Sequence, residues 1–540
     1  MNYVESFNLL GIEAKQIPSI TGEGTPTSTT EAAVGSLYMD TTTGDMYKCT
    51  AATDGVYTWA RTLDENDKNE LAENIEGKFD ATNVVQTTGD SETAVMSQKA
   101  TTEELREVIQ PNILPELPYK VYRQNGRYFT EDILNAMEID AEVEIWVDSA
   151  NGNNSNSGLS KDAPVKTLKQ AFTIYRNADV NGIIRIADGS TFHQNDLPIG
   201  ASDCVISHNL AIVCDGECEL FGGTSQTYSA YSDVVYVSNG STASAGACVD
   251  SGNVDPFGLF VPLTKKATLD EVTAEAGSWC LIDNKTYIHP ADNTNVANCK
   301  SLGTVKPLRI DFRSATQDVK IYLRGLNVVG NVEILGASAD TNYNHQFIAE
   351  NCKFQHGWSN VNAVMLNDFM ISYFIGCTGG YSALDVYNYH YLNTPQNKAT
   401  QAVAVEVNCL VEEAGFYDTS LKNTHNLSTI HDAANILRCN TRGMNAPGPM
   451  IADVNGSHSV LLDCEVLNIK IYDGLSPQNA AIQFKDDGTL RAQKAIVQNS
   501  NGYDVREGVL YSVSGVDVCV YGVDLQKTNI SNPTLLAKKI

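Results

Sequence analysis

The chain has 540 residues, 42% of them hydrophobic and 19% charged, and this length requires several domains or one elongated repeat, not a single ordinary core. The formal net charge of −28 excludes binding through nucleic-acid phosphates, which needs a basic surface, and favours a glycan or a neutral or cationic partner. No run of about 18 apolar residues occurs, and residues 1–16 lack a basic segment followed by an apolar one, so we expect neither a membrane span nor an export signal.

Residues 1–61 form the first predicted unit. The turn signals T-G-D at residues 43–45 and D-G at residues 54–55 separate runs in which apolar residues alternate, which predicts a small module of β-hairpins. The wording G-S-L-Y-M-D at residues 35–40, with D-G-V-Y-T-W at 54–59, resembles the N-terminal modules of bacteriophage tail fibres and tail spikes. The resemblance implies that residues 1–61 attach the chain to phage tail or baseplate proteins.

Residues 62–118 form a predicted helical stem and linker. Leu71, Ile75 and Phe79 recur every four residues on a charged helix, and this narrow apolar stripe has to be buried, either against copies of itself in a trimer or against its own domain. The phrase V-V-Q-T-T-G-D at residues 84–90 resembles linkers in tail proteins of gut phages. Three prolines within residues 111–118 then end any helix, and residues 119–140 are predicted to bridge to the next domain.

Residues 141–540 form the predicted body. A-P at residues 163–164 opens a helix with Leu168, Ala171 and Phe172 on one side, after a strand that ends in V-D at 147–148. Short apolar runs stopped by Gly, Asn or Asp follow, which is typical of stacked parallel strands. This order resembles the start of right-handed parallel β-helix proteins of the pectate-lyase-like superfamily, where a short helix caps the first coil. The resemblance implies a mainly β fold, a right-handed parallel β-helix (solenoid).

The sequence pattern of residues about 224–307 differs from that of the runs on either side. S-W-C-L-I-D-N-K-T-Y-I-H at residues 278–289 resembles a hairpin common in β-helix phage proteins. We therefore expect a lobe inserted into the stack. Insertions into repeat proteins map to one face, which is often the face that binds a ligand.

The cysteines indicate a repeat. Five of them stand in similar phrases 25, 32, 30 and 25 residues apart, which predicts one stacked cysteine in each coil: Cys352, Cys377, Cys409, Cys439 and Cys464. The thirteen cysteines contain no C-x-x-C pair, and the nearest two, Cys214 and Cys218, lack a second pair that would complete a zinc site. We therefore predict free buried thiols, no metal site and no cofactor.

A row of acids gives the candidate site. Four acids lie 21, 26 and 21 residues apart, about one coil each, and are predicted to line one face. Carboxylates on adjacent strands, roughly 4.8 Å apart, approach the separation of glycosidase acid pairs and raise one another's pKa. The predicted catalytic residues are Asp385, Glu406, Asp432, Asp453 and His431, and the predicted sugar-binding residues are Trp358, Tyr387, Tyr389, His390 and Tyr391. Two alternatives stay open, a ladder of polar side chains that bond neighbouring turns, and a bound metal ion.

The resemblance covers the chain in outline and implies a bacteriophage tail spike or tail fibre receptor-binding protein. It implies a homotrimer that is made in the cytoplasm of the host bacterium, is carried on the virion and binds host surface polysaccharide, without nucleic acid or membrane insertion. Three functions remain open: a non-enzymatic adhesin or structural tail component, a polysaccharide depolymerase acting as hydrolase or lyase, and a secreted β-helix enzyme of a host. The last requires an export signal, which residues 1–16 lack.

Overall fold

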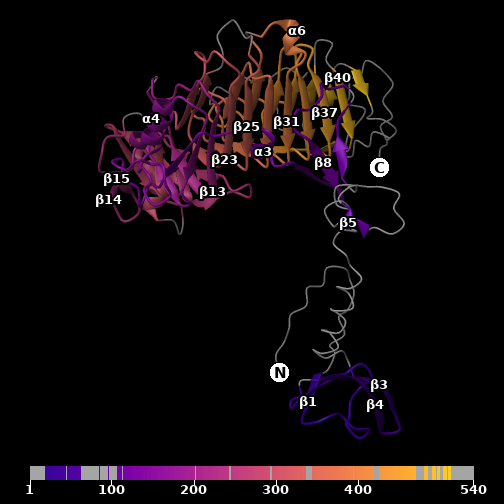
Figure 1. Ribbon diagram of the computed structural model, residues 1–540. Helices are drawn as coiled ribbons and strands as arrows, with labels where there is room; N and C mark the ends of the chain where they lie inside the picture. Colours follow the sequence, from indigo (N-terminus) through magenta and orange to yellow (C-terminus); the bar gives the residue numbers. More distant parts are fainter. Residues whose placement is uncertain are drawn as a thin grey trace. The chain divides into compact units, whose positions relative to one another are not determined.

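Figure 1 shows the computed structural model. It describes residues 19–61, 84–85, 95–96 and 106–511, except 44, 112, 201, 243–244, 292–294, 336–342, 393, 419–424, 470–479, 485–488, 494, 499–502 and 507–508. The chain divides into two units, Met1–Arg106 and Glu107–Ile540. The predicted helix that carries Leu71, Ile75 and Phe79 and most of the segment at 84–105 lie outside the described residues. No helix in the described part is long and apolar enough to cross a membrane.

The first unit is a small sheet. Strands β2 (Leu37–Asp40), β3 (Met46–Thr53) and β4 (Val56–Arg61) pair antiparallel in the two predicted hairpins, and β1 (Ser19–Gly22) adds to β2 in parallel. Its inner face carries Tyr38, Tyr47 and Cys49, which are buried. The Tyr38 ring lies 5.7 Å from the Trp59 ring, edge to face, so aromatic contacts supply most of this small core.

The second unit is built on one long sheet of 18 described strands, all paired in parallel (Figure 1). Successive repeats of the chain add strands in register, as in β28, β31 and β34. The strands are β10 (Val143–Val147), β11 (Gly182–Ile186), β12 (Ser190–Phe192), β13 (Leu210–Phe221), β23 (Lys320–Val329), β25 (Gln346–Glu350), β26 (Lys353–Gln355), β28 (Ile371–Ile375), β29 (Thr378–Gly380), β31 (Val403–Val407), β32 (Leu410–Glu412), β34 (Asn435–Cys439), β35 (Arg442–Met444), β37 (His458–Leu462), β38 (Glu465–Leu467), β40 (Thr489–Gln493), β41 (Ile496–Gln498) and β43 (Val509–Tyr511). The predicted mainly β fold with stacked parallel strands is therefore present.

A second parallel sheet contributes one strand to each later repeat. It consists of β27 (Val364–Asn367), β30 (Tyr387–His390), β33 (Ser428–Ile430), β36 (Ile451–Asp453), β39 (Ala480–Phe484) and β42 (Tyr503–Arg506), and a shorter parallel pair, β22 (Leu308–Asp311) and β24 (Val332–Leu335), precedes it. Side chains from both sheets meet in one continuous apolar core that includes Phe347, Phe374 and Tyr387. The apolar side chains of each repeat are therefore buried by the neighbouring repeats as well as by one another.

The outer face of the long sheet is also covered. The segment that precedes the sheet forms β7 (Glu107–Ile109), β8 (Val121–Gln124), β9 (Arg127–Thr130) and α3 (Ile133–Ala136). Val121 and Met137 from this segment pack with Tyr373 and Leu437 on the outward side of the strands. Both faces of these strands are therefore buried, which explains why their sequences are nearly continuous apolar runs.

Helix α4 (Leu168–Ala178) begins at Leu168, four residues after the Pro164 at which we predicted it to open, because the Thr167 hydroxyl accepts a hydrogen bond from the Gln170 amide and caps it. Its buried side is the predicted one, Leu168, Ala171 and Phe172, extended by Tyr175. These side chains join the same core as β10 and β11. The helix therefore covers apolar side chains of the first strands of the long sheet.

Residues between β13 and β22 form sheets of their own, which we call the lobe. A five-stranded sheet contains β14 (Tyr228–Ala230), β15 (Tyr236–Ser238), β18 (Thr264–Lys265), β19 (Ser278–Ile282) and β20 (Lys285–His289), and a three-stranded sheet contains β16 (Ala247–Val254), β17 (Phe260–Pro262) and β21 (Cys299–Leu302). Helix α5 (Leu269–Ala274) begins with a capping box between Thr268 and Glu271. The chain leaves and rejoins the stack here, since β13 pairs directly with β23.

The cysteine repeat is correct for four of its five members. Cys352, Cys377, Cys409 and Cys464 each stand two residues after a strand of the long sheet, whereas Cys439 is the last residue of β34 and pairs with Val407. The stacked position in that repeat belongs to Thr441, whose carbonyl accepts from the Glu465 amide as the Cys409 carbonyl accepts from Arg442. Cys439 faces the outer cluster instead. The prediction of five stacked cysteines is therefore wrong at Cys439, by two residues.

The turn just before each stacked position, which we call the corner, also repeats. The residues just before the stacked position all have positive φ, between 52° and 60°: Asn351, Gly376, Asn408, Asn440 and Asp463. These residue types tolerate the left-handed conformation best. The Asn440 Nδ2 donates to Asn408 Oδ1 at 2.9 Å, so this column forms part of a polar ladder between repeats.

Candidate functional site

The four predicted acids do not share a face. Glu406 lies on β31 of the long sheet and Asp453 ends β36 of the second sheet, and both side chains are fully buried. Asp385 and Asp432 lie in the turns before β30 and after β33. The expectation of a single acid row is therefore wrong, because a spacing near one repeat does not reveal which strand or turn a residue occupies.

Glu406 and Asp453 belong to a buried ion cluster around Arg438. Arg438 Nη1 and Nη2 donate to the two Asp453 oxygens at 2.7 and 2.9 Å, and Arg438 Nε lies 3.6 Å from Glu406 Oε2. The Ser428 hydroxyl donates to Glu406 at 2.6 Å and accepts from Arg438 at 2.9 and 3.0 Å. None of the three charged side chains is exposed, so a polymer outside the chain cannot contact them in this structure.

The predicted aromatic platform is also internal. Tyr387, Tyr389 and Tyr391 are at most 3% exposed and belong to the core, where the Tyr387 ring lies 4.6 Å from that of Phe374. The Tyr389 hydroxyl donates to Glu406 at 3.1 Å. Burial raises the pKa of Asp385, whose carboxylate accepts from Asn388 Nδ2 at 2.6 Å and from the Asn426 amide at 2.7 Å. Asp385 therefore bonds a neighbouring turn, as the ladder alternative predicts.

The structure does bring His390, His431 and Asp432 together. The two imidazole rings stack with centroids 4.0 Å apart, and His390 Nδ1 lies 3.7 Å from Asp432 Oδ2. Burial lowers the pKa of both histidines, that of His431 to about 4. Asp432 also accepts from the Tyr391 amide at 2.9 Å, which ties it to the turn beside it. All three residues are half-buried, as are Asp385 and Trp358 of the predicted set.

A larger recess lies between the lobe and the stacked strands, and we call it the lobe groove. Its volume is about 350 Å³, and its walls come from Gly246, Ala247, Pro262, Leu263, Thr264, Lys265, Trp279, Trp358, Phe416 and Tyr417. Phe416 is 43% exposed, and Trp358 and Tyr417 are half-buried, so three aromatic side chains from the stack stand at its surface. Of the predicted site residues, only Trp358 is among them.

Hydrogen bonds and close packing hold the aromatic side chains of this groove in place. Trp358 Nε1 donates to the Gly303 carbonyl at 2.9 Å, and its ring packs on Gly246, where a Cβ would lie 2.0 Å from the indole. Burial lowers the pKa of His356 to about 4. Its Nε2 donates to the Phe260 carbonyl at 2.9 Å, which leaves Nδ1 to accept from the Tyr417 hydroxyl at 2.7 Å. The aromatic side chains are thus held in place before any ligand binds.

A pair of carboxyl groups lies beside the groove. Asp255, on the loop after β16, accepts from the amides of Phe257 and Leu259 and, at 3.0 Å, from the Tyr381 hydroxyl. Burial, with the hydrogen bond and charge of Asp255, raises the pKa of Glu412 to about 9. Glu412 is 5% exposed, and its Oε1 has no hydrogen-bond partner among the described residues. Tyr381, which bonds Asp255, also contacts the Phe416 ring at 5.0 Å, so the acids and the groove share a wall.

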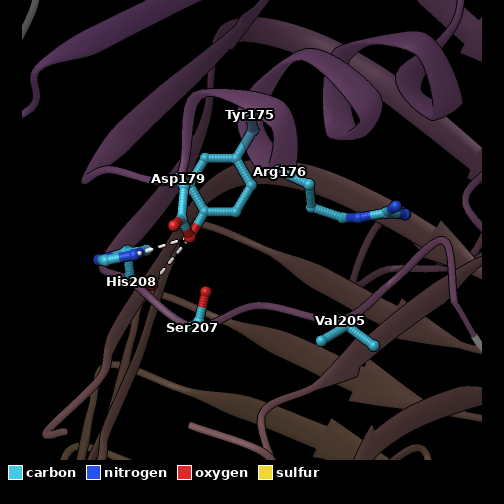
Figure 2. Close-up of a pocket in the computed structure, with 6 residues that line it drawn as sticks. All are labelled: Tyr175, Arg176, Asp179, Val205, Ser207 and His208. Carbon is cyan, nitrogen blue, oxygen red and sulfur yellow. Dashed lines mark hydrogen bonds and ion pairs between the residues drawn. The ribbon is translucent and has the colours of Figure 1, made fainter. Parts of the chain in front are cut away.

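A smaller pocket of about 150 Å³ lies beside the C-terminal end of α4 (Figure 2). There the Tyr175 hydroxyl donates to the His208 carbonyl at 2.8 Å, and His208 Nε2 lies 3.1 Å from Asp179 Oδ1. The guanidinium of Arg176 donates to the Ser202 carbonyl. Tyr175 and Asp179 both bond His208, and the pocket is smaller, so the lobe groove is the better candidate. Within the described residues no group of three or more His, Cys, Asp or Glu side chains is placed to hold a metal ion.

No protein-family model and no curated protein matches the chain. Similar solved structures include one described as a glycoside hydrolase, with 12% identity over 69% of this chain and 95% of that chain and a TM-score of 0.42. Pectate lyase Pel9A is 11% identical over 68% and 80%, with a TM-score of 0.28, and the receptor-binding domain of the siphovirus 9NA tailspike is 10% identical over 69% and 74%, with a TM-score of 0.17. At these identities and TM-scores the likenesses carry no argument about what this chain binds.

Proposed function

We propose that this chain is the receptor-binding protein of a bacteriophage tail and that it binds host surface glycan in the lobe groove. In this proposal its parallel sheets form a right-handed β-helix, the hand that parallel crossovers adopt in about 98% of cases. Residues 1–61 attach the chain to the tail, and three copies assemble on the virion. Two observations support the proposal. Residues 35–40 and 54–59 resemble the N-terminal modules of phage tail proteins, and Asn440 donates a hydrogen bond to Asn408 of the preceding repeat.

The observation that carries glycan binding is the exposed aromatic wall of the lobe groove. Sugar rings present apolar C–H faces that pack on aromatic rings, and their hydroxyls need hydrogen-bond partners at the rim. Phe416, Trp358 and Tyr417 supply the first, and Thr264 and the ammonium of Lys265 supply the second. The predicted His390, His431 and Asp432 stay candidates for contacts along a longer glycan.

Replacing Phe416 by alanine tests the groove. We expect binding to an array of purified bacterial capsular and O-antigen polysaccharides to weaken roughly ten- to hundredfold, because burying one phenyl ring contributes about 1.5–3 kcal/mol. Phe416 is 43% exposed, so the melting temperature should change little. Surface-immobilised polysaccharides and a titration of each protein give the dissociation constants.

Tyr231 provides the matched control. It is an aromatic residue of the lobe, 55% exposed and outside the groove lining, so Tyr231→Ala should bind as the natural chain does. Equal affinity of the natural chain and Phe416→Ala for a bound polysaccharide contradicts the assignment to the groove. Failure of the natural chain to bind any member of the array contradicts the receptor-binding function itself.

A second candidate function, cleavage of the bound glycan, is favoured by the Asp255–Glu412 pair. In this candidate, glycan binding uncovers Glu412, which is 5% exposed, and a carboxyl group that keeps its proton to about pH 9 beside a second carboxylate donates that proton to a leaving oxygen. The same incubations, assayed for new reducing ends or double bonds, test this candidate. If the natural chain releases product and Glu412→Gln does not, the result supports cleavage. If the natural chain binds the glycan and releases no product, it acts as an adhesin that does not cleave.

A further inference from the structure

Lys265 stands out in the lobe groove because its charge is unmatched. It lies on β18, opposite Trp279 on β19, and its Nζ is held 5.0 Å from the centre of the indole ring. The side chain is exposed and lines the groove, whereas Trp279 beneath it is 1% exposed. The ammonium is thus fixed over a ring face at the surface that a ligand enters.

Two other lysines of the lobe form ion pairs. Lys266 Nζ lies 2.5 Å from Glu275 Oε2, and Lys300 Nζ lies 2.5 Å from Glu219 Oε1. No carboxylate in the described part of the chain forms an ion pair with Lys265, although Asp and Glu outnumber Lys and Arg by 65 to 37. An unpaired cation beside aromatic walls, in so acidic a chain, is complementary to an anion brought by the ligand.

We infer that the lobe groove selects glycans with an anionic sugar, whose negative group binds Lys265 while its ring packs on the aromatic wall. This inference rests on the proposed glycan-binding function and adds the charge of the substrate. The anion is a carboxylate, as in a uronic acid, or a phosphate substituent, and both present oxygens to one ammonium. Thr264, which precedes Lys265 on β18, also lines the groove.

Three variants of the full chain separate charge from packing. Lys265→Gln should bind anionic polysaccharides about tenfold or more weakly, as expected for loss of one charge-assisted hydrogen bond. Lys265→Arg keeps a cation over Trp279 and should retain most of the affinity. Lys266→Gln removes the adjacent, paired lysine, so it should leave affinity unchanged. The natural chain's affinity should fall with added salt, and that of Lys265→Gln should fall less.

The probes are the same array polysaccharides before and after reduction of their carboxyl groups to alcohols, or after removal of phosphate substituents. Loss of binding after the first treatment assigns a carboxylate, and loss after the second assigns a phosphate. If the polysaccharides that bind are neutral, or if Lys265→Gln and Lys266→Gln behave alike, the inference is overturned while glycan binding stands. If nothing on the array binds, both the proposed function and this inference fall.

Discussion

Replacing Arg438 by methionine should lower the free energy of unfolding by about 3–5 kcal/mol, because it leaves two buried carboxylates without their cation. Arg438, Glu406 and Asp453 have no exposed side-chain surface, so water cannot replace the guanidinium. Methionine has a similar length and leaves no large void. Urea titration followed by tryptophan fluorescence measures the change in the transition of the second unit.

Arg442 is the control for that experiment. It pairs with Glu465 at 3.2 Å on the surface, with half of its side chain exposed, so Arg442→Met should cost at most about 1 kcal/mol. Combining Arg438→Met with Glu406→Gln and Asp453→Asn should restore part of the loss, because neutral groups no longer need a cation. A change below about 1 kcal/mol in Arg438→Met contradicts the buried cluster.

Glu412 should give the natural chain a stability that falls as the pH rises from about 5 to 9. In the folded protein its pKa is raised from 4.5 to about 9, so the folded state keeps a proton that the unfolded chain releases. The free energy of unfolding therefore decreases across this window, by at most about 1.4 kcal/mol per pH unit, and levels off above pH 9. Glutamine at position 412 stays neutral and should remove this slope.

The measurement is the difference in melting temperature between Glu412→Gln and the natural chain at each pH. Other titrating groups contribute equally to both proteins, so their effects cancel. Glu275→Gln makes the same change at a carboxylate that is 52% exposed on the lobe surface, and it is the control for the substitution itself. A flat difference curve for Glu412→Gln is evidence against a protonated Glu412 in the folded state.

The repeat pattern could be predicted from the sequence because turn residues end each strand at a fixed place. Asn351, Asn408 and Asn440 mark that corner with a left-handed conformation that few residues adopt. Which face a strand residue occupies could not be predicted, because the bridging segment buries the outer face as thoroughly as the core buries the inner one. Cys439 was therefore predicted to stack with the other cysteines although it faces outward.

The residues of the candidate site could be predicted from the sequence only in part. Trp358 was predicted as a sugar-binding residue, but Phe416 lies 58 residues later and Lys265 lies on the lobe, and only the fold brings them to one groove. Glu406 and Asp453 were predicted as surface acids because nothing near them in the sequence identifies Arg438 as their partner. Residue spacing reported the repeat length and not the direction of the side chain.

The most direct test of the account is a crystal structure of the chain with an oligosaccharide prepared from a polysaccharide that it binds. We expect sugar density in the lobe groove, with one ring packed on Phe416 or Trp358 and an anionic group at Lys265. Sugar bound elsewhere, for example over His390 and His431, with the groove empty, would contradict the central claim.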